Sequence, residues 1–405
     1  MYAALRYFFV GYAVFFFYTY IPAYRFIIDD SNLKPAIWLS VLWAFALFVL
    51  VGTESARAML RTPLSIWCYA YLFVASCSAI LAPGPALDTT AYSDAVVWSI
   101  SVVVMQVIFS GDEKFQRFAR FSILAGLVVA TASCILDFVD PGNFVPFDHP
   151  SSNPGRAAGF YVNANSAGFA LILGAIASIG LLNSSLRRLL IVAVSGAIIL
   201  TFSRGAFLVW LLVILYWYHS RTLTPRDIWI ALAAVLALGV VIATAFASVQ
   251  LEQSSINNIL QRTEWLSSPL DIQDDSGLER AGVLRLAWTY FLQSPAFGHG
   301  LGTTYIWEER SATHNIYMEL VVQFGLLGPL LLLWLFYGVA YKTTSISKSM
   351  CRTTILAFMF WGLFSHNLLS DYSIPVMFAL VSAMGHARFN RPKEIAFNPV
   401  ELSRT

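Results

Sequence analysis

Twelve apolar runs dominate this chain of 405 residues, most of them long enough to cross a lipid bilayer. A transmembrane helix needs about 20 mostly apolar residues. With 58% hydrophobic and 12% charged residues, the chain has too little polar surface to cover a soluble globule. We therefore predict an all-α, polytopic membrane protein. The runs lie at residues 4–23, 35–52, 63–82, 92–110, 118–138, 162–183, 189–203, 206–219, 228–249, 316–341, 353–369 and 376–389.

The apolar stretch from Leu189 to Tyr218 is too long for one membrane helix. Ser203, Arg204 and Gly205 interrupt it, and glycine is typical of turns. We expect two short helices joined by a tight hairpin, which form the seventh and eighth spans.

The positions of Lys and Arg predict the orientation, because cytoplasmic connections of membrane proteins are rich in both. With both chain ends in the cytoplasm, most of the 25 basic residues are cytoplasmic. Shifting the topology by one span would reverse this bias. The basic residues left on the outer side are nearly all arginines: Arg25, Lys34, Arg156, Arg204, Arg262, Arg280, Arg285 and Arg310.

The expected topology divides the chain into four parts. Residues 1–249 hold spans 1–9, 250–315 form a large outer loop, 316–389 hold spans 10–12, and 390–405 form a cytoplasmic tail. So long a connection is unusual between spans that are otherwise joined by short turns, which points to a function.

Part of the large loop has the pattern of an amphipathic helix. Arg280, Leu284, Trp288 and Phe291 share one helical face, which favours a helix that lies on the membrane or packs on the bundle. Arg285 is about 140° away around that helix. Both arginines can face one site only if the helix is irregular.

Arginines held on the outer side against the charge bias suggest an anionic ligand there. The guanidinium group binds phosphate with two parallel hydrogen bonds and stays charged in a partly dry site. Arg156, Arg204 and Arg280 are the main candidates, and Arg285, Arg262 and Arg310 are more simply explained as solvated. Each of the first three also has a simpler explanation. Arg156 is then a solvated loop cation, Arg204 a side chain that extends to the membrane interface, and Arg280 a charge on the helix surface.

His314 lies where the outer loop meets the tenth span. An imidazole is suited to removing a proton from a sugar hydroxyl, and the alternative is a histidine bonded to the backbone at a helix N-terminus. His299 lies in a glycine-rich stretch typical of a tight turn, and His149 is most simply a solvated loop residue. His366 either positions a residue of the site around His314 or only makes an interhelical hydrogen bond.

The acidic residues offer weak candidates for a metal site. Asp29 and Asp30 form one pair, and Asp274 and Asp275 another, but neither pair has further ligands nearby in the sequence. Arginines can supply the positive charge that a departing diphosphate needs, so we expect neither a metal nor another cofactor.

Four motifs follow one another along the chain: Ser203-Arg204-Gly205-Ala206; Arg280 followed by Pro295, Gly298, Gly300 and Gly302; His314-Asn315; and Gly325-x-x-Gly328. Their order resembles the O-antigen ligase and polymerase superfamily of bacterial envelope glycosyltransferases. Where that family often carries a tryptophan shortly after its helix arginine, this chain has Leu284, with Trp288 one turn later. The register of that helix therefore leaves Arg285 as an alternative to Arg280.

The resemblance implies a GT-C-like fold, related to the glycosyltransferases that use lipid-linked sugars. It also implies a multi-pass protein of the bacterial inner membrane with a periplasmic active site. An O-antigen ligase of this kind transfers O-polysaccharide from undecaprenyl diphosphate to lipid A-core and completes lipopolysaccharide, inverting the anomeric carbon without a metal. Carried onto this sequence, the general base is His314, and the diphosphate ligands are Arg204, Arg280, Arg156 and, as the alternative on the helix, Arg285.

Other functions fit parts of the sequence. An O-antigen polymerase or a protein O-oligosaccharyltransferase of the same superfamily would use the same donor and base, but the single large outer loop ending at His314 favours a ligase. A twelve-span transporter would keep charged groups near the bilayer midplane. Here Asp94, Asp137, Arg204 and His366 fall near outer ends of spans, and the two halves show no repeat.

Overall fold

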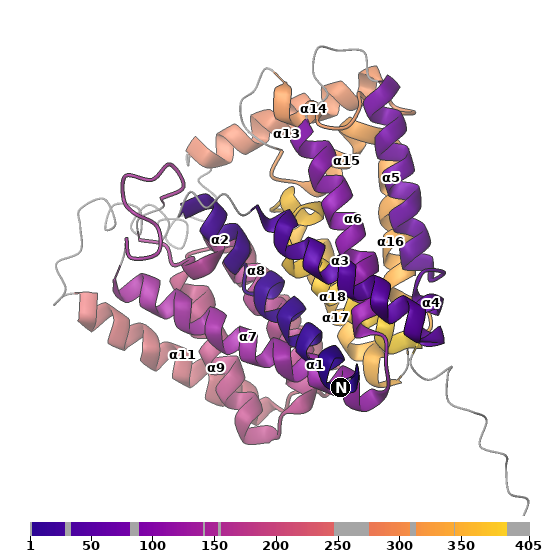
Figure 1. Ribbon diagram of the computed structural model, residues 1–405. Coiled ribbons are helices and arrows are strands. Elements are labelled where there is room, and N and C mark those ends of the chain that lie inside the picture. The colour runs from indigo at the N-terminus through magenta and orange to yellow at the C-terminus, as the bar shows by residue number, and fades with distance from the viewer. Residues whose placement is uncertain are drawn as a thin grey trace, which may run out of the picture.

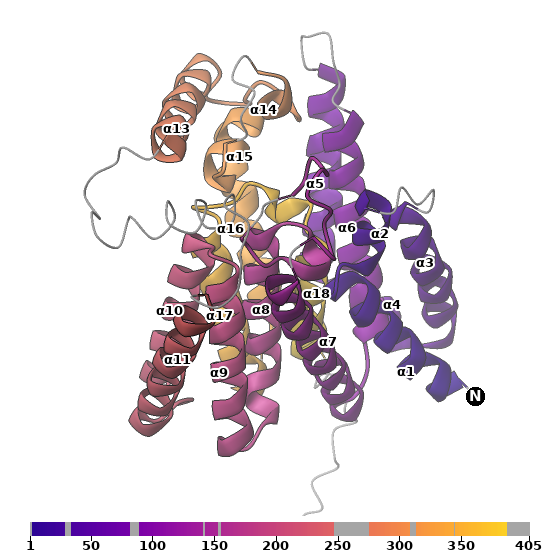
Figure 2. The same ribbon diagram turned by 90° about the vertical axis from the view of Figure 1, so that its left-hand side faces the viewer.

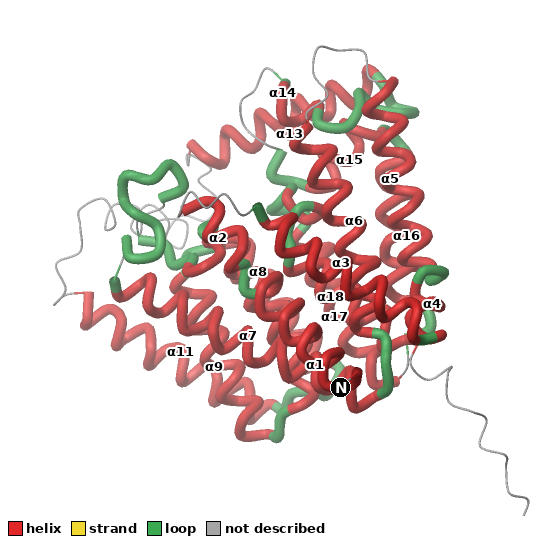
Figure 3. Tube along the Cα trace, viewed as in Figure 1, coloured by secondary structure: helices red, strands yellow, loops and turns green. Residues whose placement is uncertain are grey.

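The computed structural model describes residues 2–28, 34–81, 89–140, 142–152, 155–246, 275–307, 313–343 and 345–386. Throughout these residues the chain forms helices and connections without strands (Figure 3). The prediction of an all-helical protein is confirmed. Much of the loop 250–315 and the whole tail 390–405 lie outside the described residues, so the predicted four-part division stays a prediction.

The helices follow one another in the order shown in Figure 1. The first half contains α1 (Tyr2–Ala13), η1 (Val14–Tyr18), α2 (Ile21–Ile28), α3 (Pro35–Gly52), α4 (Glu54–Met59), α5 (Pro63–Leu81), α6 (Thr89–Phe109), α7 (Glu113–Val139), η2 (Gly159–Tyr161), α8 (Ala164–Ser178) and η3 (Ile179–Leu181). The second half contains α9 (Ser184–Leu200), α10 (Arg204–His219), α11 (Pro225–Phe246), α13 (Asp275–Gln293), α14 (Thr303–Ile306), α15 (Ile316–Phe324), α16 (Leu327–Ala340), α17 (Ser345–Trp361), η4 (Asn367–Leu369) and α18 (Ser373–His386).

Five helices of the described chain are long and apolar enough to cross a membrane: α3, α5, α6, α7 and α8 with η3. The segment from α1 to α2 would make a sixth, although it bends by 45°. The helices α10, α16 and α18 are apolar but shorter. Each predicted apolar run coincides with helix, so the chain is a multi-pass helical protein, and the count of twelve spans stays a prediction.

Three predicted spans differ from simple helices. The run 4–23 is bent between η1 and α2. The run 353–369 leaves helix after Trp361, and residues 362–366 form a turn before η4. The run 316–341 is divided into α15 and α16 at Gly325. Gly325 has φ +58°, and a Cβ there would lie 2.5 Å from the Pro295 carbonyl oxygen. Only glycine fits this close backbone approach, so the run that the sequence predicts as one helix breaks there.

The predicted hairpin between the seventh and eighth spans is confirmed. α9 ends at Leu200 and α10 begins at Arg204. Ser203 caps α10, because its hydroxyl oxygen accepts a hydrogen bond from the Ala206 N–H at 3.3 Å.

The helices pack side by side in one bundle. α8 and α18 are buried along nearly their whole length. α18 packs along α6, α7 along α8, and α10 along α17. Figures 1 and 2 show α13 and α14 at one end of the bundle, with the chain's N-terminus toward the other. We call the first of these ends the α13 end.

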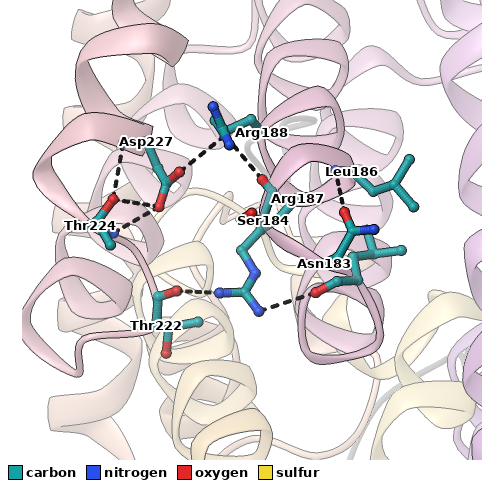
Figure 4. Close-up of polar contacts among 9 residues, drawn as sticks. Asn183, Ser184, Leu186, Arg187, Arg188, Thr222, Thr224 and Asp227 are labelled. Atoms are coloured by element: carbon teal, nitrogen blue, oxygen red, sulfur yellow. Dashed lines mark hydrogen bonds and ion pairs between the residues drawn. The ribbon is translucent and has the colours of Figure 1, made fainter.

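Polar contacts at the end of the bundle opposite the α13 end join α9 to the start of α11 (Figure 4). Arg187 donates to the Thr222 carbonyl oxygen at 2.7 Å, and Arg188 pairs with Asp227 at 3.3 Å. The Asp227 carboxylate also accepts hydrogen bonds from the Thr224 N–H at 2.9 Å and its hydroxyl at 2.8 Å. These contacts form a capping box at the first turn of α11.

Removing this box should destabilise the protein without affecting its chemistry. We expect Asp227→Ala to lower stability by about 0.5–2 kcal/mol, the usual cost of losing a helix cap, measured as a lower midpoint of thermal unfolding in detergent. Asp227→Asn is the matched control: it keeps the oxygen that caps α11 and loses only the ion pair with Arg188, which costs less. A drop in transfer activity with an unchanged midpoint would contradict this assignment.

Candidate functional site

Several connections meet at the α13 end. The connection after α17 touches both α10 and α15. The Ile316 N–H donates to the Gly362 carbonyl oxygen at 2.9 Å. Gly205 packs so closely on the same connection that a Cβ there would lie 3.0 Å from Phe364. The start of α10 and the start of α15 are therefore held against one turn, residues 362–366.

Two of the predicted arginines lie close together at this end. Arg156 donates from Nε to the Thr201 carbonyl oxygen at 3.1 Å and from Nη2 to Asn165 Oδ1 at 2.9 Å. The same Asn165 oxygen accepts a hydrogen bond from the Ser203 hydroxyl at 2.8 Å. Because Arg204 follows Ser203 directly, the structure brings Arg156 and Arg204 to one place, and both are half-buried.

The setting of these arginines favours an anion. Asn165 lies in the first turn of α8, and Arg204 is the first residue of α10. Helix N-termini direct N–H groups and a partial positive charge outward. The two arginines therefore reinforce the field of two helix ends, an arrangement suited to binding a phosphate or diphosphate.

His314 lies immediately before α15 in an unusual backbone conformation. Its φ is +48°, in the left-handed region that residues other than glycine seldom occupy. The neighbouring Asn315 caps α15, since its side-chain oxygen accepts from the Tyr317 N–H at 2.9 Å and the Met318 N–H at 3.2 Å. Asn315 therefore caps α15, and backbone strain of the kind seen at His314 often marks functional sites. A hydrogen bond from the His314 side chain to the backbone stays an alternative for this residue.

His314 faces a second histidine. Its ring centroid is 5.4 Å from that of His366, with the two planes at 76°. His366 is half-buried, and its Nδ1 has no hydrogen-bond partner among the described residues. Since His366 follows Phe364 by two residues, the turn that touches Arg204's helix also carries the histidine that faces His314.

The helix α13 differs in part from the prediction. Its buried face carries Val283 and Ala287, which pack against Val322 on α15. Leu284 and Trp288, predicted to share a face with Arg280, are 44% and 51% exposed. α13 therefore packs on the bundle, as one of the two alternatives predicted, but through these smaller residues and not through the predicted face.

The α13 arginines are not brought to the site by described contacts. The backbone of Arg280 belongs to α13, but its side chain lies outside the described residues, and Arg285 is exposed. The roles of both in diphosphate binding stay predictions. The structure does not describe several other residues that the sequence singled out: Asp29, Asp30, Arg262, Asp274, the Asp275 side chain and Arg310.

Two other histidines have structural contacts. His299 Nε2 lies 2.7 Å from the Tyr290 carbonyl oxygen, in a turn where Gly298, Gly300 and Gly302 all have positive φ, so the predicted tight turn is confirmed. His149 is half-buried, with Nε2 3.2 Å from the Ile27 carbonyl oxygen and Nδ1 accepting from a backbone N–H. Its interpretation as a solvated residue is wrong, because its loop packs on α2.

Sequence analysis missed one acidic residue beside the histidines. Glu319 is only 7% exposed and lines a small polar cavity together with Asp94 and His366. A signal was available, because Glu319 is an ionisable residue inside an apolar run, and such residues are seldom placed there without a role.

Comparison with protein families bears on this arrangement. Residues 189–333 match the model of a family described as O-antigen ligase. The matched residues, which we call the O-antigen ligase domain after that description, cover less than half of the chain. That family comprises glycosyltransferase-like membrane enzymes, whose substrates are lipid-linked polysaccharides. Among curated proteins, no relative matches this chain.

The O-antigen ligase domain runs from α9 into α16 and includes Arg204, Arg280, Arg285 and His314. Arg156 and His366 lie outside the matched residues. The tertiary structure brings both residues to the candidate site, because the connection before α8 and the connection after α17 both reach the start of α10. The candidate site therefore combines residues from the domain with residues from either side of it.

Proposed function

We propose that this protein is an O-antigen ligase, which transfers O-polysaccharide from undecaprenyl diphosphate to lipid A-core and so completes lipopolysaccharide. The observation that carries the proposal is the meeting of Arg156, Arg204, His314 and His366 at one end of the bundle, in a chain with an O-antigen ligase domain. One group suited to deprotonating a hydroxyl and two cations suited to a diphosphate are the parts that such a transfer needs.

The proposed reaction is a direct displacement at the anomeric carbon. His314 removes the proton from an acceptor hydroxyl as the oxygen attacks, and the bond between the anomeric carbon and the diphosphate oxygen breaks. Arg204 and Arg156, with Arg280 or Arg285 from α13, stabilise the negative charge that develops on the departing undecaprenyl diphosphate. A single displacement inverts the configuration of the sugar.

In the proposed setting the protein spans the bacterial inner membrane with both chain ends in the cytoplasm. The α13 end then faces the periplasm, where undecaprenyl-linked polysaccharide and lipid A-core would meet. The positive bias of the predicted cytoplasmic connections supports this orientation.

The test is reconstitution of purified protein with lipid-linked polysaccharide and lipid A-core. Polysaccharide attached to lipid A-core, seen as a ladder of products, is the expected result. Longer lipid-linked chains without attachment to lipid A-core would indicate a polymerase instead. Transfer only to an added acceptor protein would indicate an oligosaccharyltransferase.

Transfer should also survive removal of divalent cations. The arginines are assigned the charge-stabilising role that a divalent ion has in many glycosyl and phosphoryl transfers, so we expect an unchanged rate after treatment with EDTA. The measurement is the initial rate before chelation, after chelation and after adding back magnesium or manganese. Loss with EDTA and recovery with a metal would overturn the metal-independent mechanism.

A further inference from the structure

A small cavity at the α13 end lies beside the histidine pair and has a distinct chemistry. Its volume is about 30 Å³, room for about two water-sized groups. The polar and aromatic side chains around it come from four helices and the 362–366 turn, and they are Tyr71, Asp94, Tyr305, Glu319, Gln323 and His366.

Two polar atoms at this cavity need a partner. Glu319 accepts a hydrogen bond on Oε1 from Gln323 at 3.1 Å. Its Oε2 is buried and, within the described part of the chain, has no hydrogen-bond partner, since the Thr313 hydroxyl lies beside it outside hydrogen-bond geometry. His366 Nδ1 is buried and lacks a partner among the same residues. A buried polar group left without a partner costs about 1–3 kcal/mol, so both atoms favour a bound hydroxyl or water.

The cavity carries the opposite charge character from the arginine pair. Arg156 contacts Asn165 on α8, and Arg204 is the first residue of α10, whereas Asp94 and Glu319 come from α6 and α15. The 362–366 turn contacts both groups, through Phe364 on one side and His366 on the other. Asp371, another carboxyl at this end, caps α18 through Ser373 and does not line the cavity. A diphosphate is attracted to the arginines and repelled by Asp94.

From this division of charge we propose that the cavity is the acceptor subsite, which binds an uncharged sugar of the acceptor through a hydroxyl or hydroxymethyl group inserted between Glu319 and His366. A whole sugar ring is too large for the cavity. The ring would remain outside, against the 43% exposed ring of Tyr305, and a neighbouring hydroxyl would face His314. This inference rests on the proposed function.

The setting of Glu319 fits an uncharged ligand. Its carboxyl group is buried beside Asp94, so an anionic ligand would be repelled there, whereas a hydroxyl group would not be. The groups that face Glu319 and His366 around the cavity are Asp94 on α6, Tyr71 on α5, Tyr305 on α14 and His314 on the connection before α15.

The experiment measures the KM for lipid A-core and the KM for undecaprenyl-diphosphate-linked polysaccharide with the purified full-length protein. Glu319→Leu removes the hydrogen-bonding group at similar volume and should raise the KM for lipid A-core about tenfold, with the KM for the lipid-linked donor unchanged. Glu319→Gln should restore the acceptor KM, because an amide can also form a hydrogen bond with a hydroxyl group. Arg156→Gln is the reciprocal variant: it should lower kcat and raise the KM for the donor, and it should leave the KM for lipid A-core unchanged.

Tyr305→Ala provides a second measurement that does not alter the core, because this side chain is partly exposed. It should also raise the KM for lipid A-core alone. The inference is overturned if Glu319→Leu raises both KM values equally. If the Glu319→Leu variant does not fold, the Tyr305→Ala variant decides, and an unchanged KM for lipid A-core in that variant overturns the inference. If the wild-type protein makes no product, the proposed function is overturned and the subsite with it. If the wild type is active and both variants keep its KM for lipid A-core, the subsite alone is overturned.

Discussion

Replacing His314 with alanine should nearly abolish transfer while leaving the fold and donor binding intact. The acceptor hydroxyl is a weak nucleophile, and a positioned general base is typically worth about 10²–10⁴-fold in rate. Folding should survive because Asn315, and not His314, caps α15. The measurement is the initial rate of attachment to lipid A-core, at an expression level and size-exclusion profile equal to those of wild type.

The matched control is His149→Ala, the same change in another connection. Its ring contacts the Ile27 carbonyl oxygen, so this variant tests the general effect of losing a half-buried histidine, and near-wild-type transfer is expected. Retention of most activity in His314→Ala would reduce His314 to a loop residue. His366, which faces it at 5.4 Å, would then be the next residue to test as the base.

Arg204→Lys should cost about 10²–10³-fold in rate although the charge is kept, which is the usual effect of removing one donor that stabilises a transition-state charge. A guanidinium group can hold a diphosphate with two parallel hydrogen bonds, whereas an ammonium group supplies a point charge. The loss should appear mainly in kcat, because charge on the leaving oxygen develops as the bond to the sugar breaks.

Arg188→Lys is the control for this substitution. Arg188 lies just before the matched residues 189–333 and at the opposite end of the bundle, where it pairs with Asp227 (Figure 4). Its replacement should leave kcat unchanged. Equal activity of Arg204→Lys and wild type would show that Arg204 is an interfacial side chain, and the diphosphate would then have to be bound by Arg156 and the arginines of α13.

The class of fold and most of the helix positions follow from the sequence alone. Runs of apolar residues without interruption have no stable alternative to helix in a bilayer, since every backbone polar group must be satisfied within the segment. The hairpin at Ser203 and Gly205 was predicted because a capping hydroxyl acts on its own neighbours. The turn around His299 was predicted because glycines favour positive φ angles, although the close fit of Gly298 against Gln323 depends on packing.

Which residues meet depends on how the helices pack. Arg156 bonds to Asn165 close by and to Thr201, 45 residues further along the chain, and no spacing reveals the second contact. The break at Gly325 likewise depends on the Pro295 backbone packing against it. The partners of His314 and Glu319 were also hidden in the sequence, because His366 and Asp94 lie far away along the chain and approach only when the bundle packs. Periodicity records which face of a helix is apolar, but burial and charge at a site are sums over neighbours that only packing assembles.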